Sequence, residues 1–315
     1  MALEEFGSYQ LLEKIDEGGM AEVFLALENQ GSSMQNPVVI KRMLKKDLNS
    51  LRVLELFMHE ANINMRMDHP NVIKLLDFGS IEDRFYISME HIEGLNLKQL
   101  LRKIKEFKFE PLTIYDSVYI AMKASEGLFH AHNVKDENTN RSINIIHKDV
   151  STDNIMIDLS GKVKVIDFGV STSNELKRLN SEDGKHPYMS PEQALGEELD
   201  QRADIFSLGA VLWELLAGRR LYNGSTVEVL KEMAQKAKIV DLNQITPGLP
   251  KKLLDIVDKA LKKDKQKRFT DMGAFRNELS DFLNKHCPSY KNDNLVALVG
   301  LIIEERTKKT FQSNF

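Results

Sequence analysis

The most informative pattern in the chain is the stretch Ile146 to Gly169, I-H-K-D-V-S-T-D-N-I-M-I-D-L-S-G-K-V-K-V-I-D-F-G. Asp149 and Asn154 precede two short runs rich in β-branched residues, and Asp167 follows the second run. Turn residues at 158–161 separate the runs, so the pattern predicts a β-hairpin. Such a hairpin would bring two acids and an amide to one end. These groups are suited to accepting a hydroxyl proton and to holding magnesium on a triphosphate.

The tripeptide Asp-Phe-Gly also occurs earlier, at residues 77–79. This first copy lies in L-L-D-F-G-S-I-E-D-R-F-Y-I-S-M-E, which predicts two strands joined by a polar turn. A bare D-F-G arises by chance in about one chain in twenty of this length at average composition. We therefore assign a structural role to Asp77 and the metal-binding role to Asp167.

Length and composition are those of an ordinary globular protein. The chain has 315 residues, of which 42% are hydrophobic and 29% charged, and its net charge is −4. This length suffices for a large core and predicts two lobes. The weak negative charge gives no reason to expect binding to nucleic acid. Cys287 is the single cysteine, so no intrachain disulfide can form, and we expect a reducing compartment, the cytoplasm.

Neither the start of the chain nor its apolar segments predict a membrane span. Residues 1–7 are acidic and short, unlike a signal peptide. The longest apolar run, Leu295 to Ile303, is about half as long as a segment that spans a bilayer. We interpret it as a buried helix that begins near Asp293 or Asn294. Its apolar face could dock within the chain, which we favour, or on a partner protein.

Two features near the N-terminus are suited to binding phosphates, and a third can position one of them. Tyr9 to Leu27 predicts two strands around the turn Gly18-Gly19, where glycine lets backbone N–H groups approach phosphate oxygens. Val38 to Lys41 is a strand run that ends in a lysine, a cation for phosphate groups. Glu60 lies on a predicted amphipathic helix, which can direct its carboxylate towards Lys41.

In this order, the motifs resemble those of bacterial serine/threonine protein kinases of the eukaryotic-like family. Residues 146–169 are similar to that family's H-R-D-L-x-x-x-N and D-F-G segments. V-V-I-K is similar to its V-A-I-K, and Lys41 with Glu60 resembles the lysine–glutamate pair of active kinases. The resemblance extends over about residues 9–283.

The resemblance implies that the chain uses ATP and Mg²⁺. The family's glycine loop corresponds to Asp16, Gly18, Ala21 and Val23, so an acid replaces its first glycine. Met89 is expected behind the adenine, the backbone of 90–92 at its edge, and Asn96 at the ribose. The residues implied to bind ATP are Ile15, Gly18, Gly19, Val23, Lys41, Met89, Glu90, Ile92 and Asn96.

The resemblance also assigns the chemical step. Asp149 is implied to be the general base, or the group that orients the substrate hydroxyl, and Asn154 and Asp167 are implied to hold Mg²⁺. Lys148 replaces the family's arginine and cannot make a bidentate contact with phosphate. Ser151 replaces the lysine that steadies the γ-phosphate in serine/threonine kinases.

Further residues take their expected roles from the same resemblance. Lys185, in G-K-H-P-Y-M-S-P-E, stands where the family has threonine; it either supplies the charge that Ser151 lacks or faces substrate or solvent. Glu192 is implied to pair with Arg268, and Asp204 to bind the backbone of the catalytic loop, residues 147–154. The candidate autophosphorylation sites are Ser171, Thr172, Ser173 and Ser181.

We therefore expect an α+β, two-lobed protein-kinase-like fold. Residues 1–91 would form a small antiparallel β lobe with one key helix, residues 92–285 a larger and mainly helical lobe, and residues 286–315 a C-terminal helical extension. The expected activity is transfer of the γ-phosphoryl group of ATP to serine or threonine hydroxyls of protein substrates. Two alternatives stay open: a pseudokinase scaffold that binds partners without catalysis, and a tyrosine-directed kinase.

Overall fold

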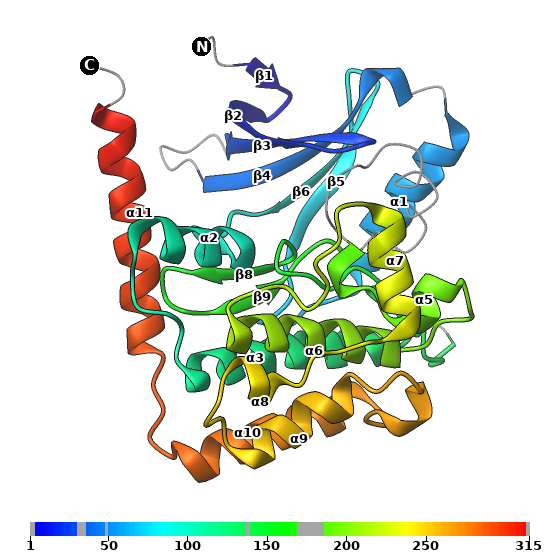
Figure 1. Cartoon of the computed structure of the whole chain (residues 1–315). Helices are drawn as coiled ribbons and strands as arrows, with labels where there is room; N and C mark the ends of the chain where they lie inside the picture. The colour runs from blue at the N-terminus through cyan, green and yellow to red at the C-terminus, as the bar shows by residue number, and fades with distance from the viewer. Residues whose placement is uncertain (1–3, 30–35, 48–49, 137–138, 169–185, 313–315) are drawn as a thin grey trace. The chain divides into compact units, whose positions relative to one another are not determined.

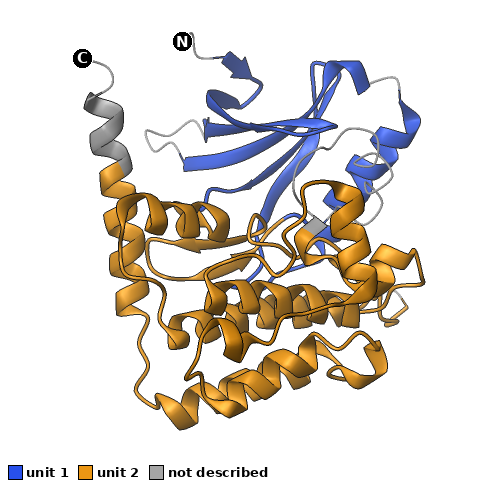
Figure 2. Cartoon of the chain, viewed as in Figure 1, with its two compact units in different colours: residues 1–92, 167–181 blue, residues 93–166, 182–315 orange. Residues whose placement is uncertain are grey.

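The computed structural model describes residues 4–29, 36–47, 50–136, 139–168 and 186–312 (Figure 1). The chain divides into two compact units (Figure 2). Unit 1 comprises residues 1–92 and 167–181, and unit 2 comprises residues 93–166 and 182–315.

Unit 1 is built around a six-stranded sheet with the strand order β1-β2-β3-β4-β6-β5. All of its neighbouring strands pair antiparallel. Its elements are β1 (Glu4–Phe6), β2 (Tyr9–Glu17), β3 (Ala21–Glu28), β4 (Asn36–Met43), η1 (Lys45–Asp47), α1 (Leu51–Met65), β5 (Leu75–Ile81) and β6 (Arg84–Glu90).

The orientation of helix α1 follows from its apolar spacing. Ser50 caps its N-terminus by accepting a hydrogen bond from the backbone N–H of Val53. Phe57 and Ala61, which are four residues apart on one face, pack against buried residues of β3, β4 and β6. Glu60 lies between them in the sequence and is also buried. The packing of this apolar face therefore directs Glu60 towards the sheet.

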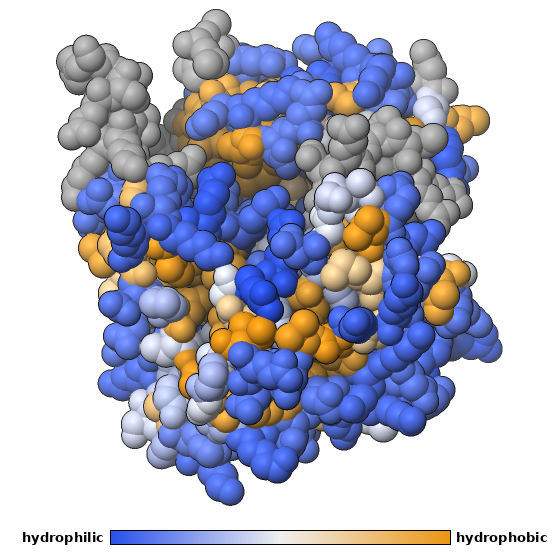
Figure 3. Space-filling view, viewed as in Figure 1, coloured by the Kyte–Doolittle hydropathy of each residue, from blue (hydrophilic) through white to orange (hydrophobic). Residues whose placement is uncertain are grey.

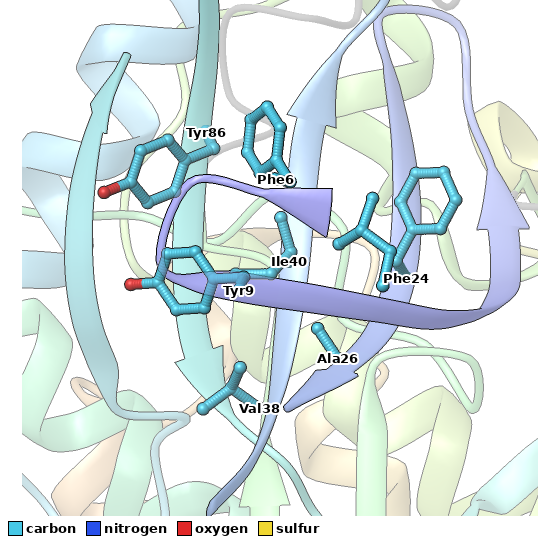
Figure 4. Close-up of a cluster of buried hydrophobic side chains, with 8 residues drawn as sticks. Phe6, Tyr9, Phe24, Ala26, Val38, Ile40 and Tyr86 are labelled. Carbon is cyan, nitrogen blue, oxygen red and sulfur yellow. The ribbon is translucent and has the colours of Figure 1, made fainter. Parts of the chain in front are cut away.

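The first D-F-G copy lies in the hairpin of β5 and β6, as predicted for two strands joined by a turn. Figure 4 shows Tyr9 and Tyr86 in a cluster of buried side chains, with both hydroxyl groups pointing the same way. These hydroxyls donate hydrogen bonds to Asp77 Oδ2, at 3.2 Å and 2.7 Å respectively. Burial and the Asp77 carboxylate raise the pKa of both tyrosines, so they remain protonated donors. Asp77 therefore serves the packing of unit 1.

Unit 2 is mainly helical and contains the three-stranded sheet β7-β8-β9. Its elements are β7 (Gly94–Asn96), α2 (Leu97–Phe107), α3 (Ile114–His132), β8 (Ile155–Asp158), β9 (Val163–Val165), η2 (His186–Tyr188), α5 (Pro191–Leu195), α6 (Arg202–Ala217), α7 (Val227–Lys236), α8 (Leu242–Ile245), α9 (Lys251–Ala260), η3 (Lys265–Lys267), α10 (Met272–His286) and α11 (Asp293–Gln312).

Helix α6 forms the centre of unit 2. It is buried on nearly every side, including Trp213, and it contacts both α3 and α9. Gly218 ends the helix in the left-handed conformation, with φ of 67°, which glycine adopts without strain. The predicted hairpin before D-F-G is present as β8 and β9. A β-rich unit and a mainly helical unit confirm the predicted α+β fold.

The C-terminal helix corrects one expectation. Leu295, Val299 and Ile302 are fully buried, but Leu301 is 49% exposed, so the apolar run is not a helix buried on all sides. The reason is that α11 contacts α2, β7 and β8 along one face only (Figure 1). Just before the helix, Asn292 Nδ2 donates a hydrogen bond to the carbonyl of Gly161 at 3.2 Å. This part of the extension docks within the chain, which is the alternative that we favoured.

The visible surface is largely hydrophilic in each unit (Figure 3). Across the described residues, no helix combines the length and the apolar character that crossing a membrane requires.

Candidate active site

Strand pairing brings three predicted residues of unit 1 together. Val23 on β3 lies opposite Asp16 on β2 and opposite Lys41 on β4. The Lys41 ammonium donates a hydrogen bond to Glu60 Oε1 on α1 and lies 3.8 Å from Asp167 Oδ1. Two carboxylates from distant parts of the sequence therefore hold one ammonium.

The charge of this lysine is secured by its neighbours. Only 12% of the Lys41 side chain and 3% of the Glu60 side chain are exposed. Burial alone would lower the pKa of Lys41, but the carboxylates of Glu60 and Asp167 outweigh burial and raise it above its usual value. Lys41 therefore remains a cation at neutral pH, the state in which it attracts phosphate oxygens.

The glycine turn after β2 does not need glycine for its own folding. Neither Gly18 nor Gly19 has a positive φ. A Cβ at Gly18 would meet only the carbonyl of Ala21, at 3.8 Å, and a Cβ at Gly19 would meet nothing within 4 Å. The Gly18 N–H donates to that same carbonyl at 2.8 Å, so it is already used within the turn. Ile15, close to the turn, is 50% exposed.

The residues expected around adenine and ribose are distributed over both units. Met89 on β6 packs against the apolar cluster beneath α1. Glu90 exchanges hydrogen bonds with the backbone of Lys74, and Ile92 ends unit 1. Asn96 belongs to unit 2, where its Oδ1 accepts a hydrogen bond from the N–H of Gln99 at 2.8 Å and caps α2. The amide oxygen of Asn96 is thus already committed to a structural bond.

In unit 2, Asn154 and Asp149 contact each other directly. Asn154 Nδ2 donates to the Asp149 carbonyl at 2.8 Å and to Asp149 Oδ2 at 3.1 Å. Because Nδ2 makes both bonds, the amide oxygen of Asn154 is the atom left to bind a cation. The backbone carbonyl of Asn154 accepts the N–H of Ile166, which joins the catalytic loop to the end of the β8–β9 hairpin.

Asp204 organises the backbone of the catalytic loop. It accepts the N–H groups of His147 and Lys148, each at 2.8 Å, and contacts His132 Nε2 at 2.7 Å. Burial alone would raise the pKa of Asp204, but the hydrogen bond and charge of His132 outweigh it and lower the pKa. Asp204 therefore stays ionised and can hold both N–H groups. The contact agrees with the structural role that the resemblance implied.

The residues that depart from the kinase pattern differ in how the structure places them. Ser151 is fully buried, and its Oγ has no hydrogen-bond partner within the described part of the chain. Its neighbour Thr152 contacts the Tyr188 hydroxyl at 2.7 Å, which in turn donates to Glu214 at 2.7 Å. Lys185 lies outside the described residues, and so do the candidate phosphorylation sites Ser171, Thr172, Ser173 and Ser181.

Glu192 and Arg268 form a buried bidentate ion pair. Arg268 Nη1 and Nη2 donate to the two carboxylate oxygens of Glu192, at 2.6 Å and 2.7 Å. The remaining guanidinium hydrogens are satisfied by the carbonyls of Lys262, Lys263 and Arg202. This pair, implied by the resemblance, fastens α5 to the segment before α10.

Two residues of the site were missed in the sequence. His132 contacts Asp204, and Gln193 on α5 donates from Nε2 to the Lys148 carbonyl at 2.7 Å. The pattern Ser190-Pro-Glu-Gln193 is a capping box and could have indicated the start of α5. No local signal connects either residue to the catalytic loop.

The donor atoms suit magnesium. Among the described residues, no cluster of three or more His, Cys, Asp or Glu side chains could hold a metal ion. The two candidate ligands, the Asp167 carboxylate and the Asn154 amide oxygen, are hard oxygen donors. Mg²⁺ is commonly bound by one or two protein oxygens together with substrate phosphates and water, so the residues fit that ion.

Comparison with known families settles the classification. The family model described as the protein kinase domain matches residues 9–280. The chain belongs to the protein kinase family. The motifs that resembled this family in the sequence all lie within the matched range.

Bacterial relatives support a kinase of the eukaryotic-like type. The kinase is 34% identical to "Tyrosine-protein kinase MasK" of Myxococcus xanthus over 90% of its own length and 44% of the relative's. It is 32% identical to "Serine/threonine-protein kinase PrkC" of Bacillus subtilis over 84% of its own length and 38% of the relative's. The kinase therefore spans less than half the length of these curated relatives.

Solved structures agree on the fold. The crystal structure of the Mycobacterium tuberculosis PknI kinase domain superposes with a TM-score of 0.64 and 19% sequence identity. The superposition covers 88% of this kinase and 97% of that chain. At this identity, the comparison supports the fold alone.

Proposed function

We propose that the chain is an ATP- and Mg²⁺-dependent protein kinase that phosphorylates serine or threonine hydroxyls of protein substrates. The observation that carries the proposal is the buried Lys41 ammonium held by Glu60 and Asp167. A lysine that serves only the sheet has no need of two carboxylates that come from a helix and from D-F-G. An ammonium fixed in this way is prepared to bind phosphate oxygens.

Each unit contributes separate tasks to the proposed reaction. In unit 1, Lys41 binds the α- and β-phosphates, and Asp167 is a metal ligand. In unit 2, Asp149 accepts the proton of the substrate hydroxyl or orients that hydroxyl, and Asn154 supplies the second metal ligand. Magnesium, when bound, neutralises charge on the β- and γ-phosphates. The rate enhancement then comes mainly from positioning and from charge stabilisation.

The glycine turn supports nucleotide binding. Neither the packing nor the backbone conformation of Gly18 and Gly19 requires glycine, since a Cβ at Gly18 would make one ordinary contact and a Cβ at Gly19 would make none within 4 Å. Because glycine has no Cβ, it lets a phosphate group approach the backbone closely, which would explain the two glycines independently of the turn. Since the Gly18 N–H is used within the turn, we assign the phosphate-facing N–H to Gly19.

A pseudokinase scaffold is the main alternative for the activity. Asp16, Lys148 and Ser151 depart from the kinase pattern and favour it. Against it we weigh the Lys41–Glu60 contact and the Asn154–Asp149 contact, which join residues that the proposed reaction uses. We therefore propose an active kinase that transfers phosphate, and not a pseudokinase scaffold.

The hydroxyl acceptor is a separate question. Two named relatives differ on it, since one is a tyrosine-protein kinase and the other a serine/threonine-protein kinase. Position 151 carries serine instead of the lysine that usually marks serine/threonine specificity. A tyrosine-directed kinase is therefore our second candidate. Phosphoserine and phosphothreonine should dominate in phosphoamino-acid analysis after incubation of the purified protein with Mg-ATP and a protein mixture. An Asp149→Asn variant serves as the blank, and phosphotyrosine as the main product would favour the second candidate.

We further propose that Lys185 either supplies the charge that Ser151 lacks or faces substrate or solvent, and that the autophosphorylation sites are Ser171, Thr172, Ser173 and Ser181. We also propose a cytoplasmic location, a possible docking of a partner protein through the C-terminal helix, and a division into residues 1–91, 92–285 and 286–315.

Glu60→Gln should lower kcat/KM by about tenfold or more, because the neutral amide no longer holds the buried Lys41 ammonium in one orientation. Glu55→Gln on the same helix is the control. The Glu55 side chain is 70% exposed, and we expect activity within about twofold of the parent. Steady-state kinetics at several ATP concentrations measure both variants. Equal activities of the two would contradict the role assigned to Glu60.

A further inference from the structure

The residue before Asp149 has an uncommon backbone conformation. Lys148 has a φ of 62°, in the left-handed region that residues with long side chains rarely adopt. Such a conformation persists only where the surroundings hold it in place. A loop that relaxed here would rotate the following peptide and displace the carboxylate of Asp149.

Two side chains hold the backbone of Lys148 at its two polar groups. Asp204 Oδ1 accepts the Lys148 N–H at 2.8 Å, and Gln193 Nε2 donates to the Lys148 carbonyl at 2.7 Å. Asp204 comes from α6 and Gln193 from α5, so separate elements fix each side of this residue. The carbonyl belongs to the peptide bond that Lys148 shares with Asp149.

The orientation of the Gln193 amide is determined by its other bonds. Gln193 Oε1 accepts the backbone N–H of Ser190 at 3.0 Å, and Ser190 Oγ accepts the N–H of Gln193 at 3.4 Å. A flipped amide would place its nitrogen against the Ser190 N–H and its oxygen against the Lys148 carbonyl, losing both hydrogen bonds. The donor therefore faces the Lys148 carbonyl.

Helix α5 gives Gln193 a firm base. The neighbouring Glu192 forms the buried ion pair with Arg268. Gln235 Nε2, on α7, donates to the carbonyl of Ala194 at 2.9 Å. Because the buried Glu192–Arg268 pair fastens α5, the bond from Gln193 can transmit the position of α5 to the catalytic loop.

We infer that Gln193 is a positioning residue that fixes the Lys148–Asp149 peptide and thereby orients Asp149 for phosphoryl transfer. This inference rests on the proposed role of Asp149. The bond joins the S-P-E segment to the proposed base, two parts of unit 2 that the sequence separates widely. Loss of the bond leaves the Lys148 backbone with the hydrogen bond from its N–H to Asp204 but without its side-chain donor at the carbonyl.

Gln193→Glu isolates this bond. Glutamate is a standard residue at this place in a capping box, so the contact with the Ser190 N–H is kept. The donor to the Lys148 carbonyl is replaced by a carboxylate oxygen. We expect kcat to fall about tenfold or more, with the KM for ATP within about twofold and a cooperative unfolding transition that stays above the assay temperature. Gln193→Ala, which adds no charge, should lower kcat similarly and serves if the first variant folds poorly.

Gln235→Glu is the matched control, since it makes the same chemical change on a bond to α5 that does not reach Lys148. Its kcat should stay within about twofold of the parent. If Gln235→Glu and Gln193→Glu lost kcat equally, disturbed packing of α5 would explain the loss without the bond to Lys148. That result would overturn the inference. Normal kcat in Gln193→Glu, with Asp149→Asn inactive, would overturn it as well but leave the proposed function intact. Normal turnover by Asp149→Asn would instead remove the proposed function.

Discussion

Asp167→Ala should reduce phosphoryl transfer to protein by about 10³-fold. The substitution removes the carboxylate proposed to bind Mg²⁺, and a metal ion that neutralises developing charge contributes several kcal/mol to the transition state. About 4 kcal/mol corresponds to this loss of rate. The same change removes one of the two carboxylates that hold Lys41. Transfer of labelled phosphate at saturating Mg-ATP measures the effect.

The chain supplies its own control for this experiment in the first D-F-G copy. Asp77→Ala removes the same side chain from the same tripeptide, but Asp77 binds the hydroxyls of Tyr9 and Tyr86. We expect this variant to lose stability, because two tyrosine donors lose their acceptor, while its kcat stays within about threefold of the parent. If Asp77→Ala lost phosphoryl transfer and Asp167→Ala lost only stability, the assignment of the metal role to Asp167 would be wrong.

The parts of the structure that were predictable from sequence are those encoded by local periodicity. The helix that carries Glu60 and the strand that ends in Lys41 could each be predicted from a repeating pattern, whereas the family resemblance indicated that the two side chains pair. The β8–β9 hairpin could be predicted from β-branched runs around a turn. The ion pair of Glu192 with Arg268 is different, since 76 positions separate the partners and only the family resemblance indicated it.

Contacts between distant side chains and backbone could not be predicted. Gln193 and the Lys148 carbonyl are 45 positions apart, and the sequence contains no pattern that relates them. His132 and Asp204 are 72 positions apart. The C-terminal helix shows the limit of composition: an apolar run predicted burial, but burial depends on which face finds a neighbour. In α11 that face contains Leu295, and Leu301 lies outside it.

Arg268→Ala should lower the free energy of unfolding by about 3–5 kcal/mol, because it leaves the buried Glu192 carboxylate without its partner. It also removes the hydrogen bonds that Arg268 donates to the carbonyls of Lys262, Lys263 and Arg202. Arg268→Lys should recover only part of the loss, since an ammonium cannot reproduce the bidentate geometry. Urea denaturation of the purified protein, followed by circular dichroism, measures these differences.

A double-mutant cycle separates the ion pair from the cost of an isolated charge. Adding Glu192→Ala to Arg268→Ala should cost little beyond the single change, because the buried carboxylate that was left unpaired is then removed too. Lys251→Ala is the surface control: Lys251 lies 3.5 Å from Asp255 with 88% of its side chain exposed, and we expect a change within about 0.5 kcal/mol. If Arg268→Ala were as mild as Lys251→Ala, the pair would not fasten α5. Helix α5 would then lack the anchor from which Gln193 is proposed to hold the catalytic loop.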